Sequence, residues 1–275
     1  MTILVTGATG TVGRRVVEQL LERGEHVRAL TRDPARAELP AGVDVVRGDL
    51  TDPASLEPAL DEVTGLHLIT FGGGLFAPLE TGEEILGLAR EAGVRRVTVL
   101  HGGGGTPMES AVRASGFDWT VVMPVEFMAN ALEWAPGIRS EGVVREPFVD
   151  RLSAMVHESD IGAVAAVALT EDGHGGQEYL VTGPQVLTVR DKTAAVGAAR
   201  GADVELVELT EEQALASWRG QGMPEDVIAF LIDVYRDTPP EGRTVIDTVE
   251  KVTGRPARTF AQWADEHAEH FRAQS

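Results

Sequence analysis

The sequence of 275 residues contains no cysteine, which excludes disulfide bridges, metal sites built from thiolates and a cysteine nucleophile. It also lacks any apolar run close to the roughly 18 residues that a membrane-spanning helix requires. A strand pattern begins at Ile3, so we expect no signal peptide. Together these absences predict a cytoplasmic protein with no membrane span.

Positive charge is also scarce. The chain has 24 lysine and arginine residues against 43 aspartate and glutamate residues, and its only lysines are Lys192 and Lys251. The net charge of −19 argues against nucleic acid and anionic membranes as partners, because both need basic surfaces opposite them. The charge indicates solubility, and the partner that we expect is a small-molecule substrate.

The first half of the chain alternates short apolar runs with helical patterns. Six runs are typical of buried strands, at residues 3–5, 26–30, 43–48, 66–71, 97–101 and 117–124. Between the first two runs, Val12, Val16, Val17, Leu20 and Leu21 form one helical face. This alternation predicts an α/β fold of the Rossmann type, a doubly wound parallel sheet with helices on both faces.

After about residue 131 the pattern becomes mainly helical. Helical patterns cover residues 159–172, 187–201, 210–237 and 259–271, with a strand candidate at 178–183. Ser159 or Asp160 is the predicted N-cap of the first of these helices. We expect residues 1–131 to form the Rossmann domain, completed by the segment around 150–170. Residues 132–275 are then mainly a smaller, helical substrate-binding lobe.

Gly7, Gly10 and Gly13 lie where the first strand passes into the first helix, in the segment VTGATGTVGRRVV. Glycines there permit a tight turn, let the backbone approach a pyrophosphate and let the helix pack closely on the strand. The helix N-terminus offers free amides and a positive dipole end to phosphates. An ordinary glycine-rich turn is the alternative, but this placement between strand and helix favours a dinucleotide site.

The end of the second strand indicates which dinucleotide binds. NAD sites place an acidic residue there for the ribose 2′-hydroxyl, whereas NADP sites use an arginine for the 2′-phosphate. The chain reads LTRDP, with Arg32 at about this position. Asp33 before Pro34 is the pattern of a helix cap, so Asp33 takes the structural role and Arg32 the phosphate.

The segments TGATGTVG, VRALTRDP, VVRGDLTD, AVRASGFDWTVVMPVEFMAN, SDIGAVAAVAL and VTGRPARTFAQWADEH together resemble the NmrA-like family of atypical short-chain dehydrogenases/reductases. The resemblance covers nearly the whole chain. It implies NADP(H) bound along the carboxyl ends of the strands and a small helical lobe over the substrate. It also implies the residues that contact the cofactor: Gly7, Thr9, Gly10, Thr11, Val12 and Gly13 at the pyrophosphate, Arg32 at the 2′-phosphate, Asp49 and Leu50 at the adenine, Phe71 and Gly72 at the ribose, and Pro124 and Val125 at the nicotinamide.

The chain departs from this superfamily in its chemistry. The usual catalytic pair is Tyr-x-x-x-Lys, in which the lysine lowers the pKa of the tyrosine so that it can transfer a proton. The only tyrosines, Tyr179 and Tyr235, are followed four residues later by Gly183 and Pro239. The pair is therefore absent. Some NmrA-like reductases use a lone lysine directly after the fifth strand, and this chain has none at that place.

Several other titratable residues have structural interpretations. Thr106, Pro107 and Glu109 match a capping box with proline at the first helical position. Glu126 follows the sixth strand and either faces the substrate or, as we favour, is a surface carboxylate. We interpret His157 as a structural partner of the loop before the next helix rather than as a catalyst. His267 and His270 lie in the terminal helical pattern without metal-ligand neighbours, so no metal site is predicted.

His101 is the candidate catalytic residue. It ends the fifth strand in VLHGGGG. The resemblance to the NmrA-like family implies that related enzymes have a catalytic or nicotinamide-facing serine at this position. A histidine can donate a proton near neutral pH, and ligands of open α/β sheets bind at this end of the strands. Gly102 to Gly105 leave room for a flat ligand. Two roles stay open: proton donation, or a hydrogen bond to the cofactor ribose.

The predicted function is an NADPH-dependent reductase of a quinone, enone or other conjugated carbonyl compound. Such acceptors take a hydride first and can be protonated by water, which suits a site without the Tyr-Lys pair. The alternatives are a regulator that senses NADP without turnover, or a non-redox enzyme that retains the cofactor. We expect a monomer or a homodimer.

Overall fold

The computed structural model describes residues 1–72, 77–102 and 105–273, and this part of the chain forms two compact units. Unit 1 comprises residues 1–124, 158–181 and 248–255. Unit 2 comprises residues 125–157, 182–247 and 256–275. Each unit is therefore assembled from three separate segments of the chain.

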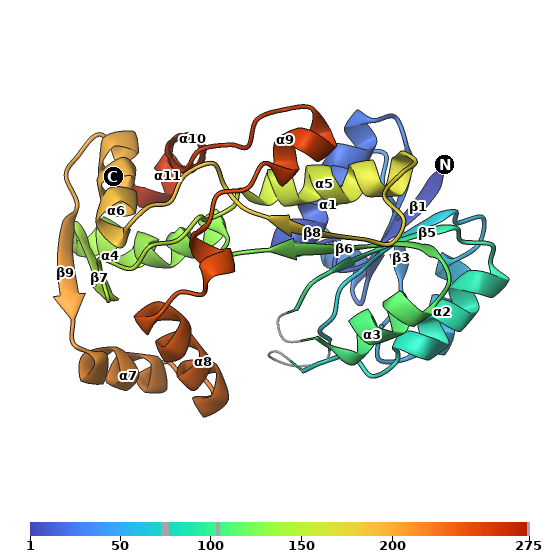
Figure 1. The fold of residues 1–275 in the computed structure, drawn as a ribbon, viewed down its shortest axis with the longest axis horizontal. Coiled ribbons are helices and arrows are strands. Elements are labelled where there is room, and N and C mark those ends of the chain that lie inside the picture. Colours follow the sequence, from blue (N-terminus) through green and yellow to red (C-terminus); the bar gives the residue numbers. More distant parts are fainter. Residues whose placement is uncertain (73–76, 103–104, 274–275) are drawn as a thin grey trace. The chain divides into compact units, whose positions relative to one another are not determined.

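Unit 1 is built on a seven-stranded sheet (Figure 1). Its strands are β1 (Thr2–Val5), β2 (His26–Thr31), β3 (Asp44–Arg47), β4 (Gly65–Leu68), β5 (Arg96–Leu100), β6 (Asp118–Pro124) and β8 (Gln177–Val181). They follow the order β3-β2-β1-β4-β5-β6-β8, and every neighbouring pair is parallel. The predicted Rossmann-type fold is confirmed, and the strand candidate at 178–183 is the seventh strand.

Helices cover both faces of this sheet, as Figure 1 shows. One face carries α1 (Thr11–Glu22), α5 (Glu158–Thr170) and α9 (Thr248–Thr253), and the other carries α2 (Gly82–Glu91) and α3 (Pro107–Ala114). Two 3₁₀ helices, η1 (Pro34–Arg36) and η2 (Pro53–Ala59), follow β2 and β3. Helix α1 buries Val12, Val16, Val17 and Leu20, as its periodicity predicts.

Helix α5 shows how closely one of these faces is packed. It is buried on nearly all sides, which explains its almost wholly apolar sequence. A Cβ atom added to Gly162 would lie 2.7 Å from the backbone carbon of Arg15 in α1, so a larger residue would push the two helices apart. The helix begins at Glu158, so the predicted N-cap at Ser159 or Asp160 is wrong. Both residues lie inside its first turn.

Unit 2 is mainly helical but also contains a strand pair that the sequence pattern did not predict. Its elements are η3 (Met128–Trp134), α4 (Ala135–Glu141), β7 (Val143–Pro147), α6 (Val189–Arg200), β9 (Glu205–Leu209), α7 (Glu211–Gly220), α8 (Glu225–Arg236), η4 (Pro240–Arg243), α10 (Phe260–Glu266) and α11 (Ala268–Phe271). β7 and β9 form a parallel pair. The predicted terminal helix is therefore two short helices that meet at His267.

Aromatic residues of α10 and α11 lie in the hydrophobic core of unit 2. Phe260, Trp263 and Phe271 are fully buried, and the Trp263 ring stacks on Phe260 with centroids 5.4 Å apart. The His267 ring also stacks on the indole, with centroids 4.4 Å apart, and its Nδ1 lies 2.8 Å from the Trp263 carbonyl oxygen. His267 is thus a packing residue of this core.

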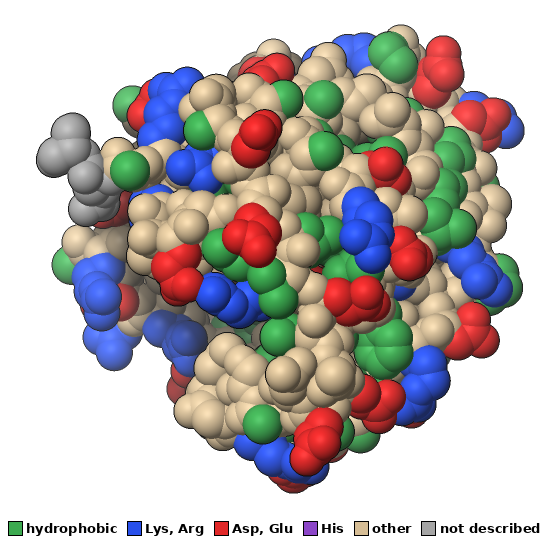
Figure 2. All heavy atoms as spheres, turned by 90° about the vertical axis from the view of Figure 1, so that its left-hand side faces the viewer, with side chains coloured by type: hydrophobic (Ala, Val, Ile, Leu, Met, Phe, Trp, Pro, Cys, Tyr) green, Lys and Arg blue, Asp and Glu red, His purple; other side chains and the backbone are tan. Residues whose placement is uncertain are grey.

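Acidic and basic side chains are interspersed on the face in Figure 2, so the negative net charge is not gathered there into one acidic surface. Among the helices that the structure describes, none is both long and apolar enough to cross a membrane. Apolar side chains are scattered among the charged ones on the face in Figure 2.

Candidate active site

The turn between β1 and α1 has the geometry that a pyrophosphate needs. Gly7 adopts the left-handed φ of +61°, and a Cβ on Gly13 would lie 2.1 Å from the Gly7 carbonyl oxygen. Gly10 is the N-cap of α1 and has no side chain with which to cap the helix. No side chain of the described residues therefore caps the amides of the first turn. The three glycines therefore keep open a turn that fits a dinucleotide phosphate.

The other residues predicted at the pyrophosphate differ in how far their side chains are exposed to solvent. Thr9 and Thr11 are exposed on the turn, so both side chains and amides are accessible to a ligand. Val12 is buried against the sheet, which leaves only its backbone amide for such a role. A phosphate at this turn would therefore contact mostly backbone groups at the start of α1.

Arg32 and Asp49 lie near one another at the ends of β2 and β3. Hydrogen bonds from the Thr51 amide and hydroxyl hold the pKa of Asp49 below its usual value, and the positive charge of Arg32 acts in the same direction. Arg32 is exposed, and no carboxylate of the described residues forms an ion pair with it. Asp33 caps η1 by accepting a hydrogen bond from Ala35, as predicted. Arg32 is therefore available to an anionic ligand.

Leu50, Phe71 and Gly72 follow the ends of β3 and β4. The Leu50 carbonyl accepts a hydrogen bond of 2.6 Å from the Thr81 hydroxyl, and its side chain is nearly buried. A Cβ on Gly102 would lie 2.5 Å from the Phe71 ring, so the ring packs directly against the chain that leaves β5. Gly103 and Gly104, two of the glycines predicted to leave room for a flat ligand, lie outside the described residues.

Pro124 and Val125 are the residues predicted at the nicotinamide. Pro124 ends β6 and pairs with Val181 of β8, which fixes it at the carboxyl end of the sheet. Val125 is the next residue and the first of unit 2. Both are partly exposed.

His101 follows the last residue of β5 and stays attached to the sheet. Its backbone amide donates a hydrogen bond of 2.8 Å to the Val122 carbonyl. Its side chain is 25% exposed, and Nδ1 lies 2.9 Å from Oε1 of Glu109, which is completely buried in the first turn of α3. Because Nδ1 faces Glu109, the exposed part of the ring is the side away from Nδ1.

Glu109 is the residue whose role sequence reasoning missed. The Thr106 hydroxyl does accept a hydrogen bond of 3.4 Å from the Glu109 amide, so half of the predicted capping box is present. The Glu109 carboxylate does not return to Thr106. It accepts a hydrogen bond of 2.9 Å from the Gly102 amide and contacts the His101 ring.

A second group of charges is buried in unit 2. The side chain of Lys192 is 1% exposed, and its Nζ donates to the Ser153 hydroxyl at 2.8 Å and lies 3.6 Å from Glu126. Burial lowers the pKa of Lys192, and the Glu126 carboxylate opposes that shift. Glu126 is only 20% exposed, so its interpretation as a surface carboxylate is wrong: the carboxylate lies against a buried cation.

Arg151 extends this group. Its side chain is 5% exposed and contacts Glu146 at 3.2 Å and Glu126 at 3.9 Å. Its guanidinium lies 3.8 Å from the centre of the Tyr235 ring, a cation–π contact. Burial raises the pKa of Tyr235. We call Glu126, Glu146, Arg151, Lys192 and Tyr235 the buried charge cluster.

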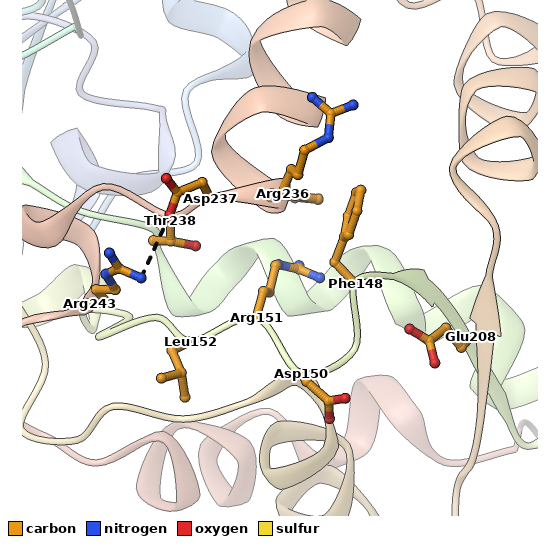
Figure 3. Close-up of a pocket in the computed structure, with 10 residues that line it drawn as sticks. Phe148, Asp150, Arg151, Leu152, Glu208, Arg236, Asp237, Thr238 and Arg243 are labelled. Carbon is orange, nitrogen blue, oxygen red and sulfur yellow. Dashed lines mark ion pairs between the residues drawn. The ribbon is translucent and has the colours of Figure 1, made fainter.

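A cavity of about 330 Å³ lies beside the buried charge cluster (Figure 3). Its lining comes from the loop after β7, from β9, from the end of α8 and from η4, and includes Phe148, Arg151, Glu208, Tyr235 and Arg243. The positive charges of its wall are already paired, as Arg243 is with Asp237 at 3.7 Å.

The remaining histidine candidate, His157, is a structural residue. It is fully buried, and its Nε2 lies 3.2 Å from the Glu266 carboxylate. This contact with a carboxylate of α10 agrees with a structural rather than a catalytic interpretation of His157.

Comparisons with known proteins identify the family. Residues 7–107 match a family model described as NAD(P)H-binding. A (4-alkanoyl-5-oxo-2,5-dihydrofuran-3-yl)methyl phosphate reductase of Streptomyces griseus is 40% identical to this chain, over 98% of this chain and 99% of its own length. An NAD(P)H azoreductase of Xenophilus azovorans is 39% identical over the same shares. The chain belongs to the NmrA-like family of atypical short-chain dehydrogenases/reductases.

A solved structure agrees with this assignment. The NADPH complex of an NADPH-dependent quinone oxidoreductase from Escherichia coli matches with a TM-score of 0.78 at 25% identity, over 97% of this chain and 99% of that chain. The chain is therefore an NAD(P)H-dependent oxidoreductase.

Proposed function

We propose that this oxidoreductase uses NADPH to reduce a small molecule whose reacting double bond is conjugated with a carbonyl group. The observation that carries the proposal is His101, a partly exposed, titratable side chain directly after β5. Ligands of open parallel sheets bind outside the carboxyl ends of the strands. This supports His101 as the residue that positions or protonates the substrate.

The class of acceptor follows from the missing Tyr-x-x-x-Lys pair. Bound NADPH supplies a hydride ion. An acceptor that takes the hydride at the carbon remote from its carbonyl group delocalises the negative charge onto the carbonyl oxygen, so protonation can follow as a later step. An isolated ketone has no such delocalisation and needs a strong proton donor at the same moment. A site with one histidine therefore suits the conjugated acceptor.

Two relatives support this class of substrate. The name of the Streptomyces griseus enzyme denotes an unsaturated lactone whose ring double bond is conjugated with carbonyl groups, and the Escherichia coli enzyme is named for quinones. For the cofactor, the exposed and unpaired Arg32 supports NADPH over NADH. We propose that residues 132–275 supply most of the contacts that select the substrate.

Turnover measurements test the proposal. Oxidation of NADPH by the purified protein should be rapid with a 2-alkanoyl unsaturated lactone and detectable with a quinone. The saturated lactone that differs only by its missing double bond is the matched control and should give no turnover. Reduction of simple ketones but not of the unsaturated lactone would overturn the proposal, as would the absence of turnover with every conjugated acceptor.

The role of His101 is tested in the same assay. The substitution His101→Ala should lower kcat by roughly 10²-fold, the usual contribution of a positioned proton donor, and leave the Kd for NADPH nearly unchanged. His101→Gln retains a hydrogen-bonding side chain and should keep most of the activity if the ring only positions the substrate. An unchanged kcat in both variants would remove His101 from the mechanism.

A further inference from the structure

The carboxylate of Glu109 is buried completely, which is costly unless neighbouring groups stabilise its charge. The Gly102 amide and the His101 ring both contact Oε1 at 2.9 Å. The guanidinium of Arg113 lies 3.7 Å from Oε2, but its Nε is bonded to Glu178 at 2.6 Å. His101 is therefore the partly exposed titratable group in direct contact with this carboxylate.

Helix capping does not account for this position. A capping glutamate returns to the amide of its N-cap residue and stays at the surface of the helix end. Glu109 instead turns toward residues 101 and 102, the first two residues after β5. The same carboxylate oxygen thus accepts a hydrogen bond from the backbone and lies in close contact with the ring at this point of the chain.

We propose that Glu109 is a positioning residue that acts through His101. Its carboxylate lies against Nδ1 and keeps that side of the ring toward the protein, so that Nε2 is the nitrogen that faces outward with a proton. This inference rests on the proposed function, because the acceptor of that proton is the reduced conjugated carbonyl compound. The charged groups around the ring in the described residues are Glu109 and, beyond it, Arg113 and Glu178.

The proton transfer balances with the hydride step. After the acceptor has gained the hydride, its electron pair resides on an enolate. The Nε2–H bond of His101 breaks, a C–H or O–H bond forms on the enolate, and the ring becomes neutral with its remaining proton on Nδ1 toward Glu109. Because the ring is 25% exposed, it can regain the proton from solvent.

A double-mutant cycle separates this role from a merely structural one. Glu109→Gln keeps an oxygen for the Gly102 amide but removes the charge, and we expect it to lower kcat by about tenfold with little change in KM. In a His101→Gln background the same change should have no further effect on kcat. Equal reductions in both backgrounds would overturn the proposal, because they would show that Glu109 does not act through His101.

A control and a second readout complete the experiment. Glu178→Gln removes the exposed carboxylate that also contacts Arg113, and it should leave kcat unchanged. In ¹⁵N spectra of histidine-labelled protein, with His101 assigned from the His101→Gln variant, Nδ1 should carry a proton and should shift in Glu109→Gln. An unprotonated Nδ1 in the neutral ring would also overturn the proposal. This readout needs no substrate, so it remains informative even if no conjugated acceptor is reduced.

Discussion

The two units use positive charge in opposite ways. In unit 1, Arg32 is exposed at the end of β2 with no ion pair in the described residues. In unit 2, Arg151 and Lys192 are almost fully buried, and both contact carboxylates of the buried charge cluster. A cation without a protein partner is available to a ligand, whereas a cation that already neutralises carboxylates contributes to the fold.

The same contrast applies to the two glutamates that sequence reasoning treated as unremarkable. Glu109 is buried in unit 1 against a partly exposed histidine, so its charge lies beside a group that is accessible from solvent. Glu126 lies in unit 2 against a lysine with almost no exposed surface. Burial of charge alone therefore does not indicate a role in the reaction; we infer a positioning role for Glu109 because its partner is accessible.

The largest effect that we expect is on the stability of unit 2. Lys192→Met would leave Glu126 without its lysine and Ser153 without its hydrogen-bond donor, and should lower the free energy of unfolding by about 3 kcal/mol. Urea denaturation measures this loss. The Kd for NADPH should stay unchanged, because the lysine is assigned to the fold.

Two further variants make this test specific. Replacing the pair together, as Lys192→Met with Glu126→Met, should recover most of the stability, since no charge is then left unpaired. Arg219→Gln, which breaks the exposed pair with Glu225, should leave the free energy of unfolding unchanged. If Lys192→Met were as stable as the parent, the buried charge cluster would not be a stabilising feature.

The next effect concerns a buried group in unit 1 that is neutral in the folded state. His67 in β4 is fully buried with Nδ1 2.8 Å from the Thr98 hydroxyl, and burial lowers its pKa from 6.5 to about 4. Between these pH values the unfolded ring binds a proton that the folded ring does not. Stability should therefore fall as pH drops from 6.5 to 4, by up to about 3 kcal/mol.

Urea denaturation at several pH values tests this expectation. His67→Gln retains a hydrogen-bonding group for Thr98 but cannot titrate, so its stability should decline less over the same range. A parent protein with the same slope as His67→Gln would show that His67 is not responsible for the acid sensitivity. The result sharpens the contrast with His101, whose ring reaches solvent.

The fold was predictable from sequence because parallel strands buried on both faces are continuous apolar runs. The six runs predicted in the first half of the chain correspond to β1 to β6. The strands β7 and β9 were missed because residues 143–147 and 205–209 mix charged and apolar residues in only five positions each. Their pairing depends on distant parts of the chain rather than on a local pattern.

The site was predictable only where local geometry determines it. The glycines of the β1–α1 turn and the cap at Asp33 follow from short-range backbone requirements. The contact between His101 and Glu109 depends on how the chain turns between β5 and α3, which a capping pattern does not specify. The pairing of Glu126 with Lys192 depends on tertiary packing in the same way.

The smallest of these effects tests the exposed cation. Arg32→Asp replaces the guanidinium with the acidic group that NAD sites use, and should reduce the preference for NADPH over NADH at least tenfold, about 1.4 kcal/mol. Fluorescence titration of both cofactors measures the two Kd values. Arg23→Asp makes the same change of charge at the far end of α1, where Arg23 pairs with Glu171, and should leave the preference intact. Equal affinity of the parent protein for NADPH and NADH would contradict the assignment, because the two cofactors differ only in the 2′-phosphate that Arg32 is proposed to bind.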